Sequence, residues 1–411
     1  VAQRPPGTPD MAGDLGSVLE DFLRRSRHLE PDDLPGEVTR MIVRLGARRA
    51  EMHLADHDQM ELRALTAPGA DQTEPKPIDS TVAGRVFRAE EPAELPEGDG
   101  TRLLLPMING SHRIGVLDVV LPDGRDAGTE RWLRVADLVT DVLVAKSAYG
   151  DRIAVTQRRR PMALRAEAQR MLLPPLTLTS ARLIVTGLLV PSYEVAGDLF
   201  DYAVSDDTLH FAVLDAMGHS LSATLTAAVA IAAYRNSRRG GGSLVEHWQA
   251  ADDAVAQEFG GERFATVVFG ELDLQTGSVR SISAGHPSAL LVRDNRVVAR
   301  CADDPTLPVG LGGDAPAVTE TNLQPGDRLL LFTDGIVEAR SHEGEFFGEE
   351  QLVEQVGREL DTGFPAPEAV RRIVRNVIDH QDGRMRDDAT LVLVEWKGRD
   401  RSREQLSPPS P

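Results

Sequence analysis

The sequence predicts an α/β chain of the α+β type with two unequal parts, each combining β-sheet and helices. Its 411 residues give a prior of two to three domains at ~150 residues per domain. Apolar residues recur at helical spacing near the N-terminus, whereas the second half of the chain is dominated by strand-like runs separated by turn signals. Many hairpin-linked strands with a few long helices indicate stacked antiparallel sheets with helices outside.

The composition narrows the class of protein. Lys and Arg number 45 and Asp and Glu number 64, so the formal net charge is −19. Nucleic acids and anionic lipid surfaces attract basic protein faces, so we expect neither nucleic acid nor membrane as a partner. Cys301 is the single cysteine, which excludes a disulfide framework. No apolar run approaches the ~18 residues of a membrane span, and we expect a soluble, cytoplasmic protein.

The first domain is expected over residues 11–150, after a proline-containing tail at residues 1–10 that we expect to be disordered. Two amphipathic helices come first and a third comes last, and a β-hairpin lies between them. The helices are expected over residues 15–23, 34–45 and 130–148. The hairpin is expected over residues 102–120, because Asn109-Gly110 is a strong turn signal between two apolar runs.

Residues 151–175 are expected to form a linker helix. Pro161 suits the first turn of a helix, where its missing N–H has no partner in any case, and Pro174-Pro175 ends the helix. An apolar stripe runs along it through Leu164, Ala168, Met171 and Leu172. Two interpretations stay open. The helix is either a tether packed on one domain, or an element that relays state between domains or pairs with a second copy of itself.

The second domain is expected over residues 176–397, and a charged, then Ser/Pro-rich tail at residues 398–411 is expected to be disordered. Strand signals dominate this domain, with long helices inserted between them. The strands are expected over residues 183–190, 208–214, 264–272, 278–283, 289–292, 328–332 and 390–396. The helices are expected over residues 221–238, 348–360 and 366–380.

Four acidic positions in this domain lie at strand ends beside small residues. They are Asp198, Asp215, Asp334 and the pair Asp387-Asp388. A lone Asp-Gly after a strand is usually a turn, but four such positions in one domain favour a shared site. Converging carboxylates repel one another and raise their pKa values, a conflict that a divalent cation removes. Oxygen-only ligation selects Mg²⁺ or Mn²⁺ over Zn²⁺, and two such ions ~3.5–4 Å apart are the usual device for hydrolysing phosphate esters.

Part of the first domain resembles the GAF domains of bacterial regulators. The resemblance is carried by the segments Asp79–Arg88, Leu103–Met107 and Arg113–Leu117. It implies a GAF-like mixed sheet flanked by helices, and regulation through a small molecule or a protein that acts on this domain. His53, His57 and His112 are scattered in the sequence and are expected to be ordinary surface histidines.

The second domain resembles the PPM metal-dependent Ser/Thr phosphatases, in the bacterial branch of SpoIIE and RsbU. The resemblance covers residues 167–396 and rests on motifs that occur in the family's order. These motifs are Gln169–Pro175, Val195–Asp198, Asp215–His219, Phe264–Thr266, Ser283–Pro287, Leu307–Gly310, Phe332–Glu338 and Asp387–Thr390. It implies an αββα sandwich of antiparallel sheets, two Mn²⁺ or Mg²⁺ ions, and hydrolysis of phosphoserine or phosphothreonine without a phosphoenzyme.

The resemblance also assigns roles residue by residue. Asp215 would bridge the two ions, with the carbonyl of Ala216 on one of them. Asp334 and Asp387 would complete the second ion's site, and Asp198 would lie close by at the metals and order water. With these four catalytic aspartates, the resemblance implies supporting roles for Gly197, Gly218, His219, His286, Gly335 and Asp388.

Three questions stay open in the sequence. His286 is expected to fix a metal-bearing turn through a hydrogen bond, whereas His219 is left undecided between that role and proton transfer. The resemblance implies a phosphorylated anti-anti-sigma protein of the STAS fold as substrate, in a circuit that controls a sigma factor, and a homodimer is a further expectation. The rival hypothesis is a ligand-sensing docking protein whose phosphatase-like domain is inactive; the intact set of aspartates argues against it.

Overall fold

The structure is a computed structural model of the chain that describes residues 11–70, 73–122, 128–190, 193, 197–218, 220–301, 306–383, 385 and 387–399. Two compact units are distinguished, Val1–Arg159 and Arg160–Pro411. Their division falls inside the expected linker, and the assignment of a GAF-like domain to the first unit stays a prediction. Each unit is described by itself.

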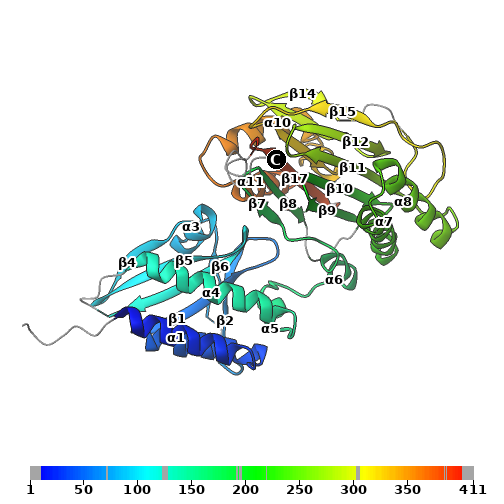
Figure 1. The fold of residues 1–411 in the computed structure, drawn as a ribbon. Coiled ribbons are helices and arrows are strands. Elements are labelled where there is room, and N and C mark those ends of the chain that lie inside the picture. The colour runs from blue at the N-terminus through cyan, green and yellow to red at the C-terminus, as the bar shows by residue number, and fades with distance from the viewer. Residues whose placement is uncertain are drawn as a thin grey trace, which may run out of the picture. The chain divides into compact units, whose positions relative to one another are not determined.

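The first unit is a six-stranded sheet with helices on both faces (Figure 1). Its helices are α1 (Met11–Ser26), η1 (Pro31–Asp33), α2 (Leu34–Arg44), α3 (Val82–Ala89), α4 (Thr129–Ser147) and α5 (Arg152–Thr156). Its strands are β1 (Arg49–Ala55), β2 (Glu61–Leu65), β3 (Lys76–Pro77), β4 (Ala93–Glu97), β5 (Gly100–Asn109) and β6 (His112–Leu121), in the order β3-β2-β1-β6-β5-β4. The main core lies between the sheet and helices α1, α2 and α4, and a smaller core lies under α3 on the other face.

The pairing in this sheet differs from the mixed pattern that the GAF resemblance implies. Every strand pair described in this unit is antiparallel. Its longest pair, β5 with β6, is a tight hairpin. Its two-residue turn is Gly110-Ser111, one residue later than the expected Asn109-Gly110, because Asn109 is still paired with His112, and a two-residue turn can only join antiparallel strands. The expected helices over residues 34–45 and 130–148 are confirmed as α2 and α4.

The expected single linker helix is wrong. Residues 151–175 contain α5 and, after a non-helical stretch, α6 (Leu164–Arg170). Because the ring of Pro161 disfavours helical backbone at the preceding residue, the helix cannot run through from α5. The expected apolar stripe is not the buried face of α6: Leu164 is 71% exposed and Met171 is 81% exposed, whereas Ala166 and Gln169 are buried.

The second unit stacks two antiparallel sheets between two layers of helices (Figure 1). One sheet has the order β15-β12-β11-β10-β9 and the other β14-β13-β16-β17-β8-β7. The strands are β7 (Thr177–Thr179), β8 (Leu183–Val190), β9 (Asp198–Ser205), β10 (Thr208–Ala216), β11 (Ala265–Asp273), β12 (Ser278–Ala284), β13 (Leu290–Arg293), β14 (Arg296–Arg300), β15 (Thr319–Asn322), β16 (Arg328–Phe332) and β17 (Ala389–Trp396). Besides α6, the helices are α7 (Leu221–Arg239), α8 (Leu244–Phe259), α9 (Asp334–Val337), α10 (Gly348–Leu360) and α11 (Ala366–His380).

Strand periodicity assigns each side chain of this sandwich to an inner or an outer face. On β10, Phe211 and Val213 pack between the sheets, whereas Ala212 and Leu214 pack outward against α7 and α8. On the other sheet, Leu330 and its outward neighbours pack against α10 and α11. Successive side chains of a strand point to opposite faces, so this alternation fixes the direction of every later residue on the same strand. The αββα sandwich expected from the sequence is confirmed.

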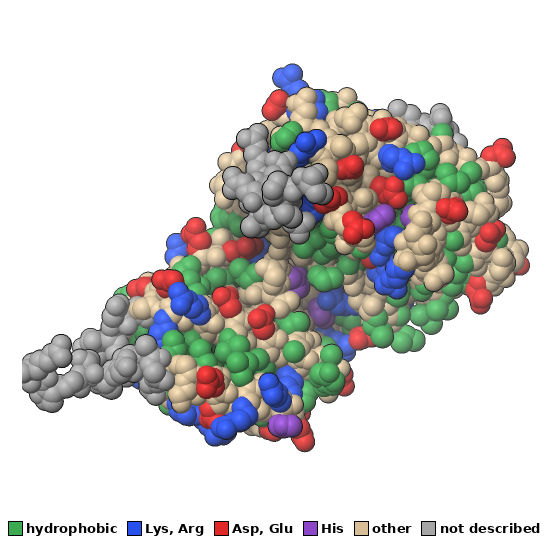
Figure 2. All heavy atoms as spheres, in the orientation of Figure 1, with side chains coloured by type: hydrophobic (Ala, Val, Ile, Leu, Met, Phe, Trp, Pro, Cys, Tyr) green, Lys and Arg blue, Asp and Glu red, His purple; other side chains and the backbone are tan. Residues whose placement is uncertain are grey.

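Surface composition follows the charge balance of the sequence. Figure 2 shows acidic and basic side chains interspersed over the visible face of the molecule. Among the described residues, no helix combines the length and the apolar character that crossing a membrane requires.

Candidate metal centre

The acidic positions named from the sequence come together at one end of the sandwich, between the two sheets. Asp198 opens β9 and Asp215 lies near the end of β10, and the two residues are directly paired across these strands. Both continue the inward-facing series, because they lie two residues from Phe200 and Val213 respectively. Their carboxylates therefore point toward the opposite sheet rather than toward solvent.

Asp198 is held by residues of that opposite sheet. Its Oδ2 accepts hydrogen bonds from Thr333 Oγ1 at 2.6 Å and from Thr390 Oγ1 at 2.8 Å. The two threonines are themselves joined, since the Thr390 N–H donates to Thr333 Oγ1 at 3.0 Å. Asp198 is 1% exposed, so this network fixes a fully buried carboxylate.

Asp388 holds the loop that leads into β9. Its Oδ2 accepts hydrogen bonds from the backbone N–H groups of Gly197 at 2.6 Å and Asp198 at 3.3 Å. Its Oδ1 is buried and has no hydrogen-bond partner. Asp387 is exposed, and its Oδ1 accepts the N–H of Asp388 at 2.9 Å. The adjacent aspartates thus divide their roles: Asp388 anchors backbone and Asp387 faces the open side.

Asp334 begins the short helix α9, directly after Thr333. The chain turns there in close contact with the Asp387-Asp388 segment. A Cβ added at Gly335 would lie 1.7 Å from the Asp388 carbonyl oxygen, so only glycine fits this turn. Gly197 is also confined, because a Cβ there would lie 3.0 Å from the carbonyl oxygens of Ala216 and Gly218.

The electrostatics of this cluster favour added positive charge. Burial, and then the charges of Asp215 and Asp388, raise the pKa of Asp198 well above its usual value. Burial and the charges of Asp334, Asp387 and Asp388 raise the pKa of Asp215 in the same way. Burial also raises the pKa of Asp334 and of Asp388, although Arg165 acts on Asp388 in the opposite direction. The carboxylates therefore repel one another, as the sequence argument anticipates.

His286 links the two sheets as a neutral imidazole. Burial lowers the pKa of His286 to about 4. Its Nε2–H donates to the carbonyl of Phe332 at 3.2 Å, and its Nδ1 accepts the hydroxyl of Thr266 at 2.8 Å. Thr266 is paired with Asp215 across β10 and β11. This geometry makes His286 a brace behind Asp215 and Asp334 rather than a group that faces a reacting atom.

Some expectations fall elsewhere. His219 lies outside the described residues, whereas Gly218 is described and has a positive φ of 87°. Among the described residues, no three of the carboxylates above bring their oxygens within 4.8 Å of one another. Two other groups of possible metal ligands meet this distance: His210 with His247 and Glu271, and Glu51 with His53 and Asp118.

Sequence reasoning missed the residues that position Asp198. Thr333 and Thr390 stand beside the predicted aspartates in two of the motifs, but their hydroxyls reach Asp198 only through the register of β16 and β17. Gln169 is buried, and its Nε2 donates to the Asp198 carbonyl at 2.7 Å. The sequence did contain a signal for Gln169: it is a polar residue in an otherwise apolar stretch, and it belongs to the family motif Gln169–Pro175.

The chemistry of this donor set fits hard divalent cations. All the side-chain atoms of this set that could bind a metal are carboxylate oxygens, and the carbonyl oxygen of Ala216 lies beside them. The Oδ1 atom of Asp388 is buried and has no hydrogen-bond partner. Mg²⁺ and Mn²⁺ prefer such ligands. Aspartates at the strand ends of two stacked antiparallel sheets are the arrangement that the resemblance to PPM-type phosphatases implies.

Comparison with known proteins gives the same class. Residues 205–397 match the model of the family described as Stage II sporulation protein E (SpoIIE). This match over most of the second unit agrees with the resemblance to PPM-type phosphatases that its motifs predicted. The match does not extend to the first unit.

Two relatives and one solved structure each match part of the chain. Protein IcfG of Synechocystis sp. is 30% identical over 146 residues, which is 35% of this chain and 22% of IcfG. Phosphoserine phosphatase RsbU of Bacillus subtilis is 22% identical over 233 residues, which is 56% of this chain and 69% of RsbU. The solved SiaA-PP2C domain of Pseudomonas aeruginosa is 20% identical with a TM-score of 0.47, and the match covers 56% of this chain and 93% of that one. The chain spans less than two thirds of the length of IcfG.

Proposed function

We propose that this protein is a metal-dependent protein serine/threonine phosphatase. The observation that carries the proposal is the set of aspartates gathered between the two sheets, with raised pKa values and a buried carboxylate oxygen that has no partner. Such a set is costly in a folded protein unless cations offset the repulsion. The family membership of residues 205–397 supports the same activity.

Different residues of the chain would bind the metal ions and orient the water. Asp215, Asp334, Asp387 and the carbonyl of Ala216 would hold two Mn²⁺ or Mg²⁺ ions, and Asp198 would orient water beside them. Bound ions of this kind lower the pKa of water and neutralise charge on phosphoryl oxygens. The contacts of Asp198 with Thr333 and Thr390 fix the direction of its carboxylate, which is what orienting a nucleophile requires.

The substrate we propose is a phosphoserine on a STAS-type anti-anti-sigma protein in a partner-switching pathway, in the cytoplasm. The relative RsbU, named a phosphoserine phosphatase, supports the choice of phosphoserine. We further propose that the first unit regulates the second as a GAF-like input domain, within a homodimer. Comparing kcat/KM and particle mass for residues 160–411 and the full chain tests this regulation; equal values for both proteins would contradict it.

Chelation tests the activity itself. The full chain should hydrolyse a phosphomonoester with added Mn²⁺ or Mg²⁺, lose activity in excess EDTA, and regain it when either ion is restored in excess. Activity that persists in excess chelator would exclude the proposed metal dependence. No activity with either ion on a phosphomonoester or a phosphoprotein would favour the rival function, a docking protein with an inactive phosphatase-like domain.

A further inference from the structure

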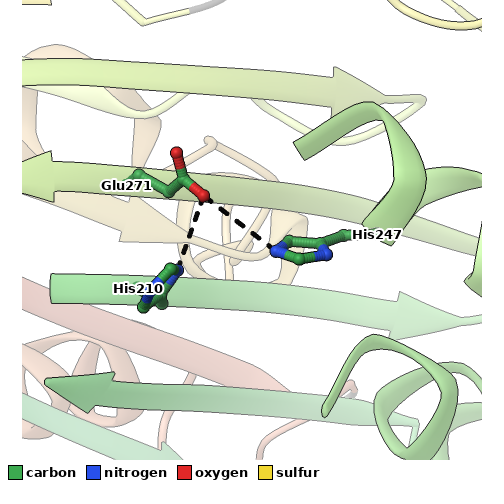
Figure 3. Close-up of side chains that lie close together, drawn as sticks. All are labelled: His210, His247 and Glu271. Carbon is green, nitrogen blue, oxygen red and sulfur yellow. Dashed lines mark ion pairs between the residues drawn. The ribbon is translucent and has the colours of Figure 1, made fainter. Parts of the chain in front are cut away.

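Three side chains on the outer face of the five-stranded sheet converge away from the carboxylates described above. Figure 3 shows His210 of β10 and His247 of α8 both directed at Glu271 of β11. Glu271 Oε1 lies 3.6 Å from His210 Nδ1 and 4.0 Å from His247 Nε2. One ligand atom from each of the three residues lies within 4.8 Å of the others.

The fold brings these residues together by register and by helix packing. His210 and Glu271 are directly opposite each other in the β10–β11 pair, and both fall in the outward-facing series of their strands. His247 is fully buried at the start of α8, next to Trp248, which packs into the outer core. Its Nδ1 hydrogen-bonds Ser237 Oγ at 2.9 Å, and this contact directs Nε2 toward Glu271.

The two imidazoles lack the partners that buried nitrogens need. His210 Nδ1 and His247 Nε2 are buried and have no hydrogen-bond partner. Burial lowers the pKa of His247 to about 4 and also lowers the pKa of His210, so both rings are neutral near pH 7 and can offer a lone pair. Arg280 lies 3.5 Å from the other oxygen of Glu271, which leaves Oε1 for the histidines.

We propose that His210, His247 and Glu271 bind one divalent transition-metal ion of the Zn²⁺ type. Two imidazole nitrogens with one carboxylate oxygen are typical zinc ligands, and a water would complete a tetrahedron. Zn–N bonds of ~2.0–2.1 Å place tetrahedral ligand atoms about 3.3–3.4 Å apart, so small side-chain rotations close the observed gaps. Ser237 supplies the outer contact that fixes the ring of a metal-binding histidine.

The second group of possible ligands, Glu51, His53 and Asp118, does not suit a metal ion. In the first unit, Lys76 Nζ lies 2.7 Å from His53 Nε2 and 3.2 Å from Asp118, which also binds Arg102. Protein cations thus already occupy the space between those residues. Beside the group of His210, His247 and Glu271, Arg280 contacts the other oxygen of Glu271, and Arg238, whose charge helps to lower the pKa of both histidines, is ion-paired with Asp201.

The proposed site is separate from the aspartates. His210 precedes Asp215 by five residues on β10, which is about 17 Å along a strand, and the two side chains point to opposite faces of the sheet. A metal here would join α8 to β10 and β11. Its effect is therefore on the stability of the second unit, not on phosphate hydrolysis.

Cobalt(II) is a suitable probe, because four-coordinate Co²⁺ with nitrogen ligands absorbs visible light far more strongly than six-coordinate Co²⁺ with oxygen ligands. The full chain is titrated with Co²⁺ in a large excess of Mg²⁺, which fills the oxygen site. We expect a strong visible band that saturates at one Co²⁺ per chain and is displaced by Zn²⁺. Zinc at 100 times its Kd should raise Tm by about 5–10 °C.

Single substitutions show whether these three residues bind the Co²⁺ that gives rise to the visible band. His210→Gln and Glu271→Gln should each abolish it, whereas His342→Gln, at an exposed histidine of the same unit, and Asp334→Asn should retain it. Both test positions are partly exposed, and circular dichroism checks that the variants fold. Absence of a strong band in the natural chain, or an equal band in His210→Gln, overturns the proposal. The first of these results would mean that ordinary water satisfies the two imidazoles.

Discussion

The carboxylate of Asp198 accepts a hydrogen bond from the hydroxyl of Thr390, a residue 192 positions later in the chain. The contact joins β9 of one sheet to β17 of the other, at the end where the acidic residues gather. The site is therefore built across the interface of the sandwich, and its geometry depends on how the two sheets stack.

Thr390→Val should lower kcat by ~10–100-fold with little change in KM. The substitution keeps the shape of the side chain but removes a hydrogen bond to a charged group, which is worth ~1.5–3 kcal/mol. The measurement is steady-state kinetics on a phosphoprotein in saturating Mn²⁺. Thr186→Val is the control, because Thr186 is a buried hydroxyl of the same sheet that pairs with Thr177. Equal losses in both variants would assign the effect of Thr390 to general packing.

Asp215→Asn and Asp334→Asn should each lower kcat by ~10³-fold, by analogy with single electrostatic groups worth ~10²–10³-fold. Losing a carboxylate that holds a cation removes both the ion and the charge stabilisation that it supplies. Calorimetric titration with Mn²⁺ should show weakened binding in parallel. Asp253→Asn, at an exposed position of α8, should leave both quantities unchanged. Normal kcat in Asp215→Asn would mean that other groups hold the ions.

Gly335→Ala should destabilise the second unit by ~1–3 kcal/mol, the usual cost of overpacking, and should also reduce activity. The added Cβ would lie 1.7 Å from the Asp388 carbonyl oxygen, so the α9 turn or the start of β17 must move. Urea unfolding measures the free energy. Gly36→Ala in α2 is the matched control, since nothing lies within 4 Å of its added Cβ and alanine favours a helix. A fully stable Gly335→Ala variant would contradict the described turn.

The His286→Gln variant should flatten the acid side of the stability profile. In the folded chain the pKa of His286 lies at about 4, below its value of 6.5 when unfolded, so the unfolded state binds the proton more tightly. Stability is therefore lost as the pH falls from 6.5 toward 4, by about 2 kcal/mol between pH 7 and pH 5. Urea unfolding across this range should show a smaller loss in His286→Gln. The His342→Gln variant, at an exposed histidine of the same unit, is the matched control.

Much of the second unit could be predicted because its strands and helices carry local signals. The ranges 183–190, 328–332, 348–360 and 366–380 coincide with β8, β16, α10 and α11. In each of them the apolar residues recur at the spacing of a strand or a helix, and a glycine, a proline or a charged residue marks where the element ends. The strands β9, β14 and β15 were not predicted, because they are short or end in polar residues, and pairing with neighbours rather than sequence defines them.

Helix α8 was missed although its signal was present. Ser243 and Glu246 form a capping box, and Leu244, Trp248, Ala251 and Val255 then follow at helical spacing. Without α8, nothing in the sequence could bring His247 near His210 and Glu271. Their convergence also needs the register of β10 against β11, which depends on tertiary packing.

The central position of β17 constrains when this protein can become active during its synthesis. β17 lies between β16 and β8, pairing with β8 from Ala389↔Val190 to Trp396↔Leu183. A nascent chain that has emerged only as far as α11 has made β8 and its neighbour β7 but not β17, and Asp198 still lacks Thr390. Such wide separation in sequence makes closure of the sheet slow and late. A ribosome stalled before Ala389 would therefore carry an unfinished sandwich, in which the proposed metal centre still lacks the contact of Asp198 with Thr390.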